Sequence, residues 1–239
     1  PSMRGMSEEQ IRNMIEKSRA DVIIHTAAIS DVGTCEKDPG ASYEANVRLP
    51  LFLAKAAKEQ KLICFSSDQV YRGCAGEGPY KEEDASPCNV YGRHKLEMEQ
   101  RVLDVKPDAV MLRAEWMYDY PAERSNYLRM LLNEKQVLMF GKQYRGITYL
   151  REVAENMPKI FMLPGGVYNF GSETKQRMYD ITCEMLHFLK SDRKPEEVPP
   201  AHNLWMDCTK AKERGILFSD AKEGLKRCLK DYHLAKDRE

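Results

Sequence analysis

Short apolar runs alternate with helical patterns along most of this chain of 239 residues. Each run is rich in aliphatic side chains and about five residues long, which is typical of a strand that is buried on both faces. A strand followed by a helix and then by another strand predicts parallel pairing with crossover helices. We therefore expect an α/β fold, a doubly wound parallel sheet with helices on both faces, from strands at residues 21–25, 62–66, 109–113 and 167–171.

Local signals place the helices between these strands. Ser7-Glu8-Glu9-Gln10 has the pattern of a capping box, so a helix should begin after Ser7. Pro50 lies inside the helical pattern of residues 42–59 and should kink that helix or mark its true start. Asn89 can cap a helix over residues 90–103. Further helices are predicted at residues 126–132, 174–189 and 221–229.

The composition excludes several classes of partner. Lysine plus arginine number 37, as do aspartate plus glutamate, which gives no electrostatic case for nucleic acid or an anionic membrane. No apolar run approaches the roughly 18–20 residues of a membrane span, and the first residues lack the apolar core of a signal peptide. The seven cysteines form no C-x-x-C pair and their number is odd. We expect neither a metal site nor a disulfide framework, and a cytoplasmic location.

Two segments carry the side chains with the clearest chemical use. The strand at residues 62–66 runs into Ser66 and Ser67, and ligands of parallel sheets bind at such carboxyl ends. Tyr91 and Lys95 are four residues apart and share one helix face. A free phenol has a pKa of about 10, and a nearby ammonium favours the phenolate and lowers that pKa. The set suits proton delivery to a carbonyl that receives a hydride from a nicotinamide cofactor.

The Y-x-x-x-K spacing is weak evidence when it stands alone. A second copy, from Tyr232 to Lys236, lies in a polar tail with no strand nearby and is interpreted as a chance match. The copy at Tyr91 is favoured because a strand ending in paired serines precedes it. Two histidines are assigned structural roles. His25 is predicted to be a satisfied core histidine, and His94 a surface residue about 100° around the helix from the lysine.

The order of the motifs resembles that of the extended short-chain dehydrogenase/reductases, and most that of their dTDP-4-dehydrorhamnose reductase group. The likeness covers nearly the whole chain. It rests on residues 21–28 (DVIIHTAA), 44–47 (EANV), 66–71 (SSDQVY), 78–84 (GPYKEED), 89–95 (NVYGRHK), 112–118 (LRAEWMY) and, more loosely, 143–149 (QYRGITY) and 203–207 (NLWMD). The combined motifs are specific for the superfamily and less specific for the reductase group.

The resemblance implies roles for individual residues. Ser67, Tyr91 and Lys95 would form the catalytic triad. Binding of the cofactor, NADP or NAD, would fall to Ala27, Ala28, Ser66, Tyr91 and Lys95. Binding of the substrate, a nucleotide-linked sugar, would fall to Asp68, Gln69 and Trp116.

The resemblance also implies a division into domains. Residues 1–115, with residues 166–172 returning to the sheet, would form a Rossmann-like domain that binds the cofactor. Residues 116–165 and 173–239 would form a smaller α+β lobe that binds the substrate. The resemblance leaves a homodimer open.

The chain departs from the family in its glycines. None of the 14 forms G-x-G-x-x-G or G-x-x-G-x-x-G, the turn that holds a pyrophosphate at a helix N-terminus. Residues 73–78 are rich in glycine but lead into Pro79 rather than a helix. The resemblance therefore predicts that an N-terminal βαβ unit of roughly 45–55 residues is absent from this sequence. The choice between NAD and NADP depends on a residue of that unit and stays open.

Two substitutions bear on the chemistry. Gln69 stands where the reductases usually carry an aromatic and where related dehydratases place a glutamate after Asp68. An amide cannot act as a base, which disfavours dehydratase chemistry. Glu115 stands where small hydroxyl residues are common. Its carboxylate would alter substrate choice if it faced the nicotinamide, and would have no such effect if it faced solvent.

These observations predict an NAD(P)H-dependent reductase of a keto group on a nucleotide-sugar, similar to the enzymes of dTDP-rhamnose biosynthesis, with Tyr91 as proton donor. Two alternatives remain open. One is a non-catalytic subunit that keeps the fold and the cofactor pocket, like the beta subunit of methionine adenosyltransferase. The other is a sugar-nucleotide epimerase, which uses similar residues but retains its cofactor. The intact triad weighs against the first alternative without excluding it.

Overall fold

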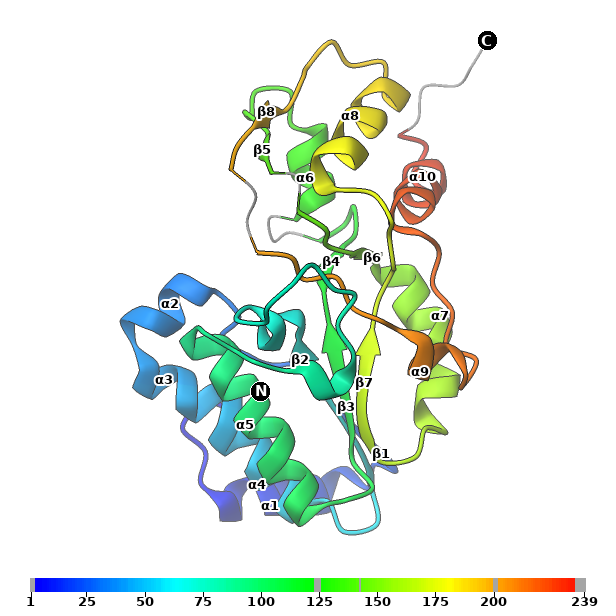
Figure 1. The fold of residues 1–239 in the computed structure, drawn as a ribbon. Helices are drawn as coiled ribbons and strands as arrows, with labels where there is room; N and C mark the ends of the chain where they lie inside the picture. The colour runs from blue at the N-terminus through cyan, green and yellow to red at the C-terminus, as the bar shows by residue number, and fades with distance from the viewer. Residues whose placement is uncertain (1–2, 123–125, 142, 200–201, 235–239) are drawn as a thin grey trace. The chain divides into compact units, whose positions relative to one another are not determined.

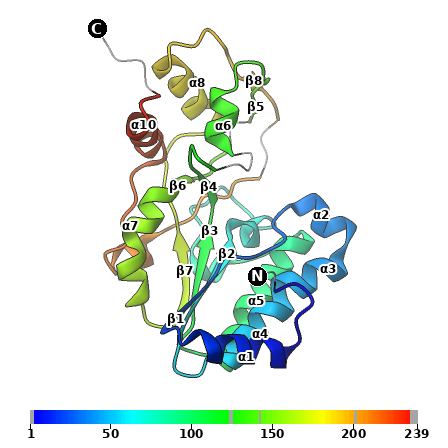
Figure 2. The same cartoon turned by 180° about the vertical axis from the view of Figure 1, so that it is seen from behind.

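The computed structural model describes residues 3–122, 126–141, 143–199 and 202–234, and Figures 1 and 2 show it from opposite sides. The described chain divides into two compact units. Unit 1 consists of Pro1–Cys74, Glu82–Ala114 and Pro158–Asn169. Unit 2 consists of Ala75–Lys81, Glu115–Met157 and Phe170–Glu239. No helix in the described ranges is both long enough and apolar enough to cross a membrane.

Unit 1 is built on a sheet with the strand order β1-β2-β3-β7. The strands are β1 (Val22–His25), β2 (Lys61–Ser67), β3 (Val110–Ala114) and β7 (Gly166–Phe170), whose last residue belongs to unit 2. The pairs β1–β2 and β2–β3 are parallel. The predicted α/β fold with a parallel sheet is thus confirmed, and each predicted strand lies within one residue of the observed bounds.

The three predicted helices of unit 1 are present, the second of them is subdivided, and one short helix was not predicted. The elements are α1 (Glu8–Ser18), α2 (Val32–Lys37), α3 (Pro39–Tyr43), the π-helical turn η1 (Glu44–Arg48), α4 (Leu49–Ala56), the 3-10 turns η2 (Asp68–Tyr71) and η3 (Glu82–Asp84), and α5 (Val90–Val105). The capping box at Ser7 is confirmed, because Ser7 and Gln10 exchange both hydrogen bonds. Pro50 lies in the first turn of α4, directly after the π-helical turn η1.

The core of unit 1 lies between one face of the sheet and the helices α1, α4 and α5 (Figure 1). Ile11 of α1, Leu53 of α4 and Met98 of α5 meet Leu62 and Met111 of the strands, and all are buried. Removing these apolar surfaces from water is the main stabilising contribution to the unit.

Unit 2 combines short strand pairs with helices. The strands β4 (Trp116–Tyr118) and β6 (Ile147–Tyr149) pair in parallel, as do β5 (Met139–Phe140) and β8 (Glu196–Glu197). The helices are α6 (Tyr127–Leu132), α8 (Met178–Phe188), α9 (Thr209–Lys212) and α10 (Ala221–Asp231), and α7 (Leu150–Phe161) runs from unit 2 into unit 1. The core of unit 2 contains three buried tyrosines, Tyr118, Tyr127 and Tyr149. Lys236, which ends the second Y-x-x-x-K copy, lies outside the described residues.

Candidate active site

The carboxyl end of β2 presents the hydroxyl of Ser67. Ser67 is the last residue of the strand and lies opposite Ala114 of β3. Its hydroxyl donates to Oδ1 of Asp68 over 3.0 Å and accepts from the Gln69 N–H over 3.2 Å. The second of these bonds caps η2, so the chain turns immediately after the strand. This turn keeps the hydroxyl at the end of the sheet where ligands of parallel folds bind.

The first turn of α5 packs directly against that turn. Asn89 caps the helix as predicted by accepting from the Gly92 N–H over 2.7 Å. Its amide donates to Oε1 of Gln69 over 3.1 Å. A Cβ at Gly92 would collide with the Gln69 carbonyl oxygen, so only glycine permits this approach. Through these contacts α5 brings Tyr91 to the end of β2 that carries Ser67.

Lys95 is held in place by the strand itself. Its Nζ donates to the Phe65 carbonyl over 2.7 Å and lies 5.8 Å from the centroid of the Tyr91 ring. Burial lowers the pKa of Lys95 to about 8. Burial and the neighbouring lysine lower the pKa of His25 to about 3. His25 is buried, but among the described residues neither ring nitrogen has a hydrogen-bond partner, so the prediction of a satisfied histidine is wrong.

A buried ion pair joins α5 to β3. Arg113 of β3 donates to Glu99 of α5 over 2.7 Å, and both side chains are at most 3% exposed. Arg113 also donates to the Tyr71 hydroxyl over 2.7 Å. Ser66 donates its hydroxyl to Glu99, and its cofactor role stays a prediction. This network was not predicted from the sequence, although an arginine inside a buried strand is a signal for a buried acidic partner.

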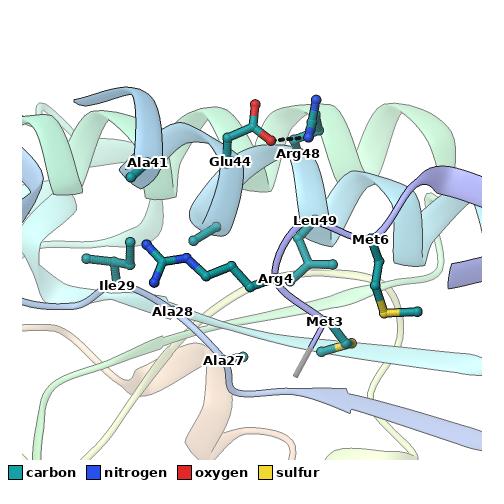
Figure 3. A pocket seen from close by; sticks show the side chains of 12 residues that line it. Met3, Arg4, Met6, Ala27, Ala28, Ile29, Ala41, Glu44, Arg48 and Leu49 are labelled. Carbon is teal, nitrogen blue, oxygen red and sulfur yellow. Dashed lines mark ion pairs between the residues drawn. The ribbon is translucent and has the colours of Figure 1, made fainter. Parts of the chain in front are cut away.

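A cavity of about 550 Å³ lies where β1 ends. Ala27 and Ala28 line it together with residues of α3, η1 and the segment before α1 (Figure 3). Their small side chains leave the cavity open, and Arg4 extends along it between the strand end and the helices (Figure 3). The largely aliphatic wall and this guanidinium fit the flat ring and the phosphates of a nucleotide. Lys95 is not among the residues that line this cavity, but its ammonium would suit the ribose hydroxyls of such a nucleotide.

The residue predicted to contact the sugar lies in unit 2. Trp116 begins β4, with its ring centroid 5.9 Å from that of Tyr127. The Arg145 guanidinium lies 5.4 Å from the centroid of the Trp116 ring. No role was predicted for Arg145, because its position beside an aromatic ring depends on the pairing of distant segments.

Glu115 faces the interior of unit 2. Thr148 donates its hydroxyl to Oε1 of Glu115 over 2.5 Å, and the Ser172 N–H donates to the same oxygen over 2.7 Å. A Cβ at Gly146 or Gly171 would collide with this carboxylate. Of the two orientations left open by the sequence, the side chain therefore does not point to solvent.

Substituting Gly92 tests the close approach of α5 to η2. Gly92→Ala should lower the free energy of unfolding by about 1–3 kcal/mol, because the added methyl meets main-chain atoms of Gln69 that cannot move aside. Gly40→Ala is the matched control, since its Cβ would make only an ordinary contact with Asp38. Urea denaturation of both variants measures the difference. Equal stability of the two variants would contradict the packing described here.

Comparisons with known proteins place these features in context. The chain matches the family described as "RmlD substrate binding domain" over residues 2–234. It is 27% identical over 205 residues to the dTDP-4-dehydrorhamnose reductase of Aggregatibacter actinomycetemcomitans, covering 81% of this chain and 69% of that protein. It is 28% identical over 235 residues to methionine adenosyltransferase 2 subunit beta of Rattus norvegicus, covering 88% of this chain and 70% of that protein.

A solved structure shares the fold. The dTDP-4-dehydrorhamnose reductase of Bacillus anthracis in complex with NADP superposes with a TM-score of 0.84 at 21% identity. The match covers 94% of this chain and 84% of that one. The Rossmann-like α/β fold that the motifs predicted is thereby confirmed.

Proposed function

Because the chain belongs to the RmlD substrate binding domain family, we propose that it is an NAD(P)H-dependent reductase of a keto group on a nucleotide-linked sugar, similar to the dTDP-4-dehydrorhamnose reductases. The observation that carries the proposal is the placement of Tyr91 and Lys95 against the end of β2 that presents Ser67. In this proposal unit 1 binds the cofactor, unit 2 binds the sugar nucleotide, and the protein works in the cytoplasm.

Each residue of the triad has a separate task. The Tyr91 phenol holds the proton that passes to the carbonyl oxygen, so the keto group becomes an alcohol. The Lys95 ammonium stabilises the phenolate left behind and donates to the ribose hydroxyls. The Ser67 hydroxyl, which donates to Asp68 in the structure, turns to donate to the same carbonyl oxygen and stabilises the charge that develops there. The nicotinamide cofactor, when bound, supplies the hydride.

Unit 2 offers groups that suit a sugar nucleotide. The Trp116 ring provides an apolar face for the sugar, as the sequence motif implies. Arg145, whose guanidinium lies beside that ring, has the charge and the planar donor geometry that bind a diphosphate. Asp68, which is buried in unit 1 beside the triad serine, is assigned to the sugar hydroxyls.

A second candidate function is that of a non-catalytic subunit with the same cofactor pocket. The likeness to methionine adenosyltransferase 2 subunit beta, which covers 88% of this chain, favours it. A thermal-shift screen with NADH, NADPH and several dTDP- and UDP-sugars tests the reductase proposal, because a ligand raises stability by RT ln(1 + [L]/Kd). We expect a rise with a reduced cofactor and a further rise with a sugar nucleotide. A rise with the cofactor alone would favour the subunit, and no rise with either cofactor would contradict both functions.

The pH dependence of the reaction should follow Lys95. Its ammonium form is present below a pKa of about 8 and is lost above it. We expect kcat/KM, which reports the free enzyme, to fall as the pH rises through about 8, because the Tyr91 phenolate then loses its neighbouring positive charge. Steady-state rates over a range of pH measure this. A value of kcat/KM that stays level well above pH 8 would show that the Lys95 charge is not needed.

A further inference from the structure

A buried hydrogen-bond chain leads from α5 to the wall of the cavity. Nδ1 of His94 lies 2.8 Å from Oγ of Ser42. Nδ2 of Asn46 donates to that Oγ over 3.2 Å and to the Ile29 carbonyl over 2.9 Å. The Ile29 N–H donates back to Oδ1 of Asn46 over 3.2 Å. Ser42 and Asn46 are fully buried and His94 is half-buried, so the prediction that His94 is a surface residue holds only in part.

The contact between Asn46 and the Ile29 backbone fixes the donor and the acceptor of every hydrogen bond in this chain. Asn46 faces both the N–H and the C=O of Ile29, so its amide can be oriented in one way only. Its Nδ2 then donates to Ser42, whose buried hydroxyl proton needs an acceptor. Among the described residues, the acceptor for that proton is Nδ1 of His94. An imidazole that accepts at Nδ1 is neutral and carries its proton on Nε2.

The environment of His94 favours this neutral form. Burial lowers the pKa of His94, Arg93 lowers it further, and Glu97 opposes them. The Tyr43 ring of α3 covers the imidazole edge-on at 5.6 Å. A protonated imidazole would leave the buried Ser42 hydroxyl without its acceptor, which is unfavourable.

The hydrogen-bond chain ends at Ile29, which lies both at the cavity and beside the buried cluster that contains Tyr91. Ile29 follows Ala28 and lines the same cavity (Figure 3). Its side chain also packs against the buried cluster that contains Tyr91. Asn46, which holds it, lies in the π-helical turn η1, and such turns are frequent at functional sites. A shift of Ile29 would therefore move the cavity wall and the support of Tyr91 together.

We propose that His94 is a positioning residue: as a neutral imidazole protonated on Nε2, it fixes Ile29 between the cavity and Tyr91. Its consequence for cofactor binding rests on the function proposed above. The hydrogen-bond chain does not depend on that function, so an experiment can contradict one without contradicting the other.

Long-range proton–nitrogen NMR of the imidazoles in the protein without cofactor tests the chain directly. We expect His94 to be the Nε2–H tautomer at neutral pH, and a mixture of tautomers in Ser42→Ala. A proton on Nδ1 of His94 in the unaltered protein would overturn the proposal. This readout does not depend on whether the protein turns over a sugar.

Hydrogen exchange at the Ile29 amide tests the mechanical role. We expect His94→Leu and Ser42→Ala each to speed this exchange about tenfold or more, since local opening becomes easier. The double variant should be no faster than either single one, because the two residues act as one unit. His94→Gln, whose carbonyl can accept at the same place, should restore most of the protection. His187→Leu, which removes an exposed imidazole from α8, should change nothing.

NADPH fluorescence titration of the same variants connects the chain to the cofactor. We expect His94→Leu and Ser42→Ala to raise the Kd of NADPH about five- to tenfold, and His94→Gln to stay near the unaltered protein. The positioning role would be overturned if hydrogen exchange at the Ile29 amide were unchanged in both His94→Leu and Ser42→Ala. It would also be overturned if that exchange were faster while the Kd of NADPH stayed the same. Absence of NADPH binding in the unaltered protein would contradict the proposed function. The tautomer of His94 and the exchange at Ile29 would still show whether the hydrogen-bond chain positions Ile29.

Discussion

Tyr91→Phe should lower turnover of a keto-sugar nucleotide at least about a hundredfold, the usual scale for a lost acid–base group. The variant keeps the ring that lies beside the Lys95 ammonium and removes only the hydroxyl. The Kd of the cofactor should therefore change much less than kcat. Steady-state kinetics together with a fluorescence titration separate the two effects.

The second Y-x-x-x-K copy supplies the matched control. Tyr232 follows α10 in unit 2, and Tyr232→Phe should leave kcat within about twofold, as expected for a change away from the site. If both variants kept a turnover near that of the unaltered protein, Tyr91 would not be the proton donor. A comparable loss in both variants would point instead to general destabilisation, which the thermal midpoint would reveal.

Arg113→Met should lower the free energy of unfolding by about 3–5 kcal/mol, because it leaves the buried Glu99 carboxylate without its counter-charge. The loss is large since both side chains are almost completely inaccessible and the same guanidinium also holds the Tyr71 hydroxyl. Guanidinium chloride denaturation measures the change.

Two further variants test whether the loss of stability comes from the unpaired buried charge. Lys55→Met breaks a half-exposed pair with Glu8 and should cost less than about 1 kcal/mol. The double variant Arg113→Met with Glu99→Leu should recover much of the loss, because no buried charge remains. A small effect of Arg113→Met alone would mean that water reaches Glu99, contrary to its burial in the structure.

Although Ile24 of β1 is 44% exposed, the sheet of unit 1 could be predicted from the sequence because its central strands β2 and β3 are buried almost throughout. Such strands are continuous apolar runs, and the caps at Ser7 and Asn89 mark the helices that flank them. The helix α7 was missed, since it follows β6 without a break and contains Pro158. The helix α2 was missed because six residues carry too little periodicity to be recognised.

The site could be predicted only as far as its motifs reach. Tyr91 and Lys95 are adjacent by helical geometry, and Ser67 follows from the end of a strand. The contact of Ser42 with His94 joins residues 52 positions apart, and no local pattern marks it. The same holds for Glu115, whose partners Thr148 and Ser172 come from distant segments. Buried polar contacts of this kind are set by tertiary packing and leave no periodic signal.

Transfer of deuterium from NADPH deuterated at the reactive carbon to dTDP-4-dehydrorhamnose is the most direct test of keto reduction. We expect the purified protein to consume the cofactor only when the sugar nucleotide is present. The sugar product should then be an alcohol that is heavier by the transferred deuterium, as read by mass spectrometry. A protein that binds NADPH but forms no deuterated product would contradict the reductase and favour the non-catalytic subunit.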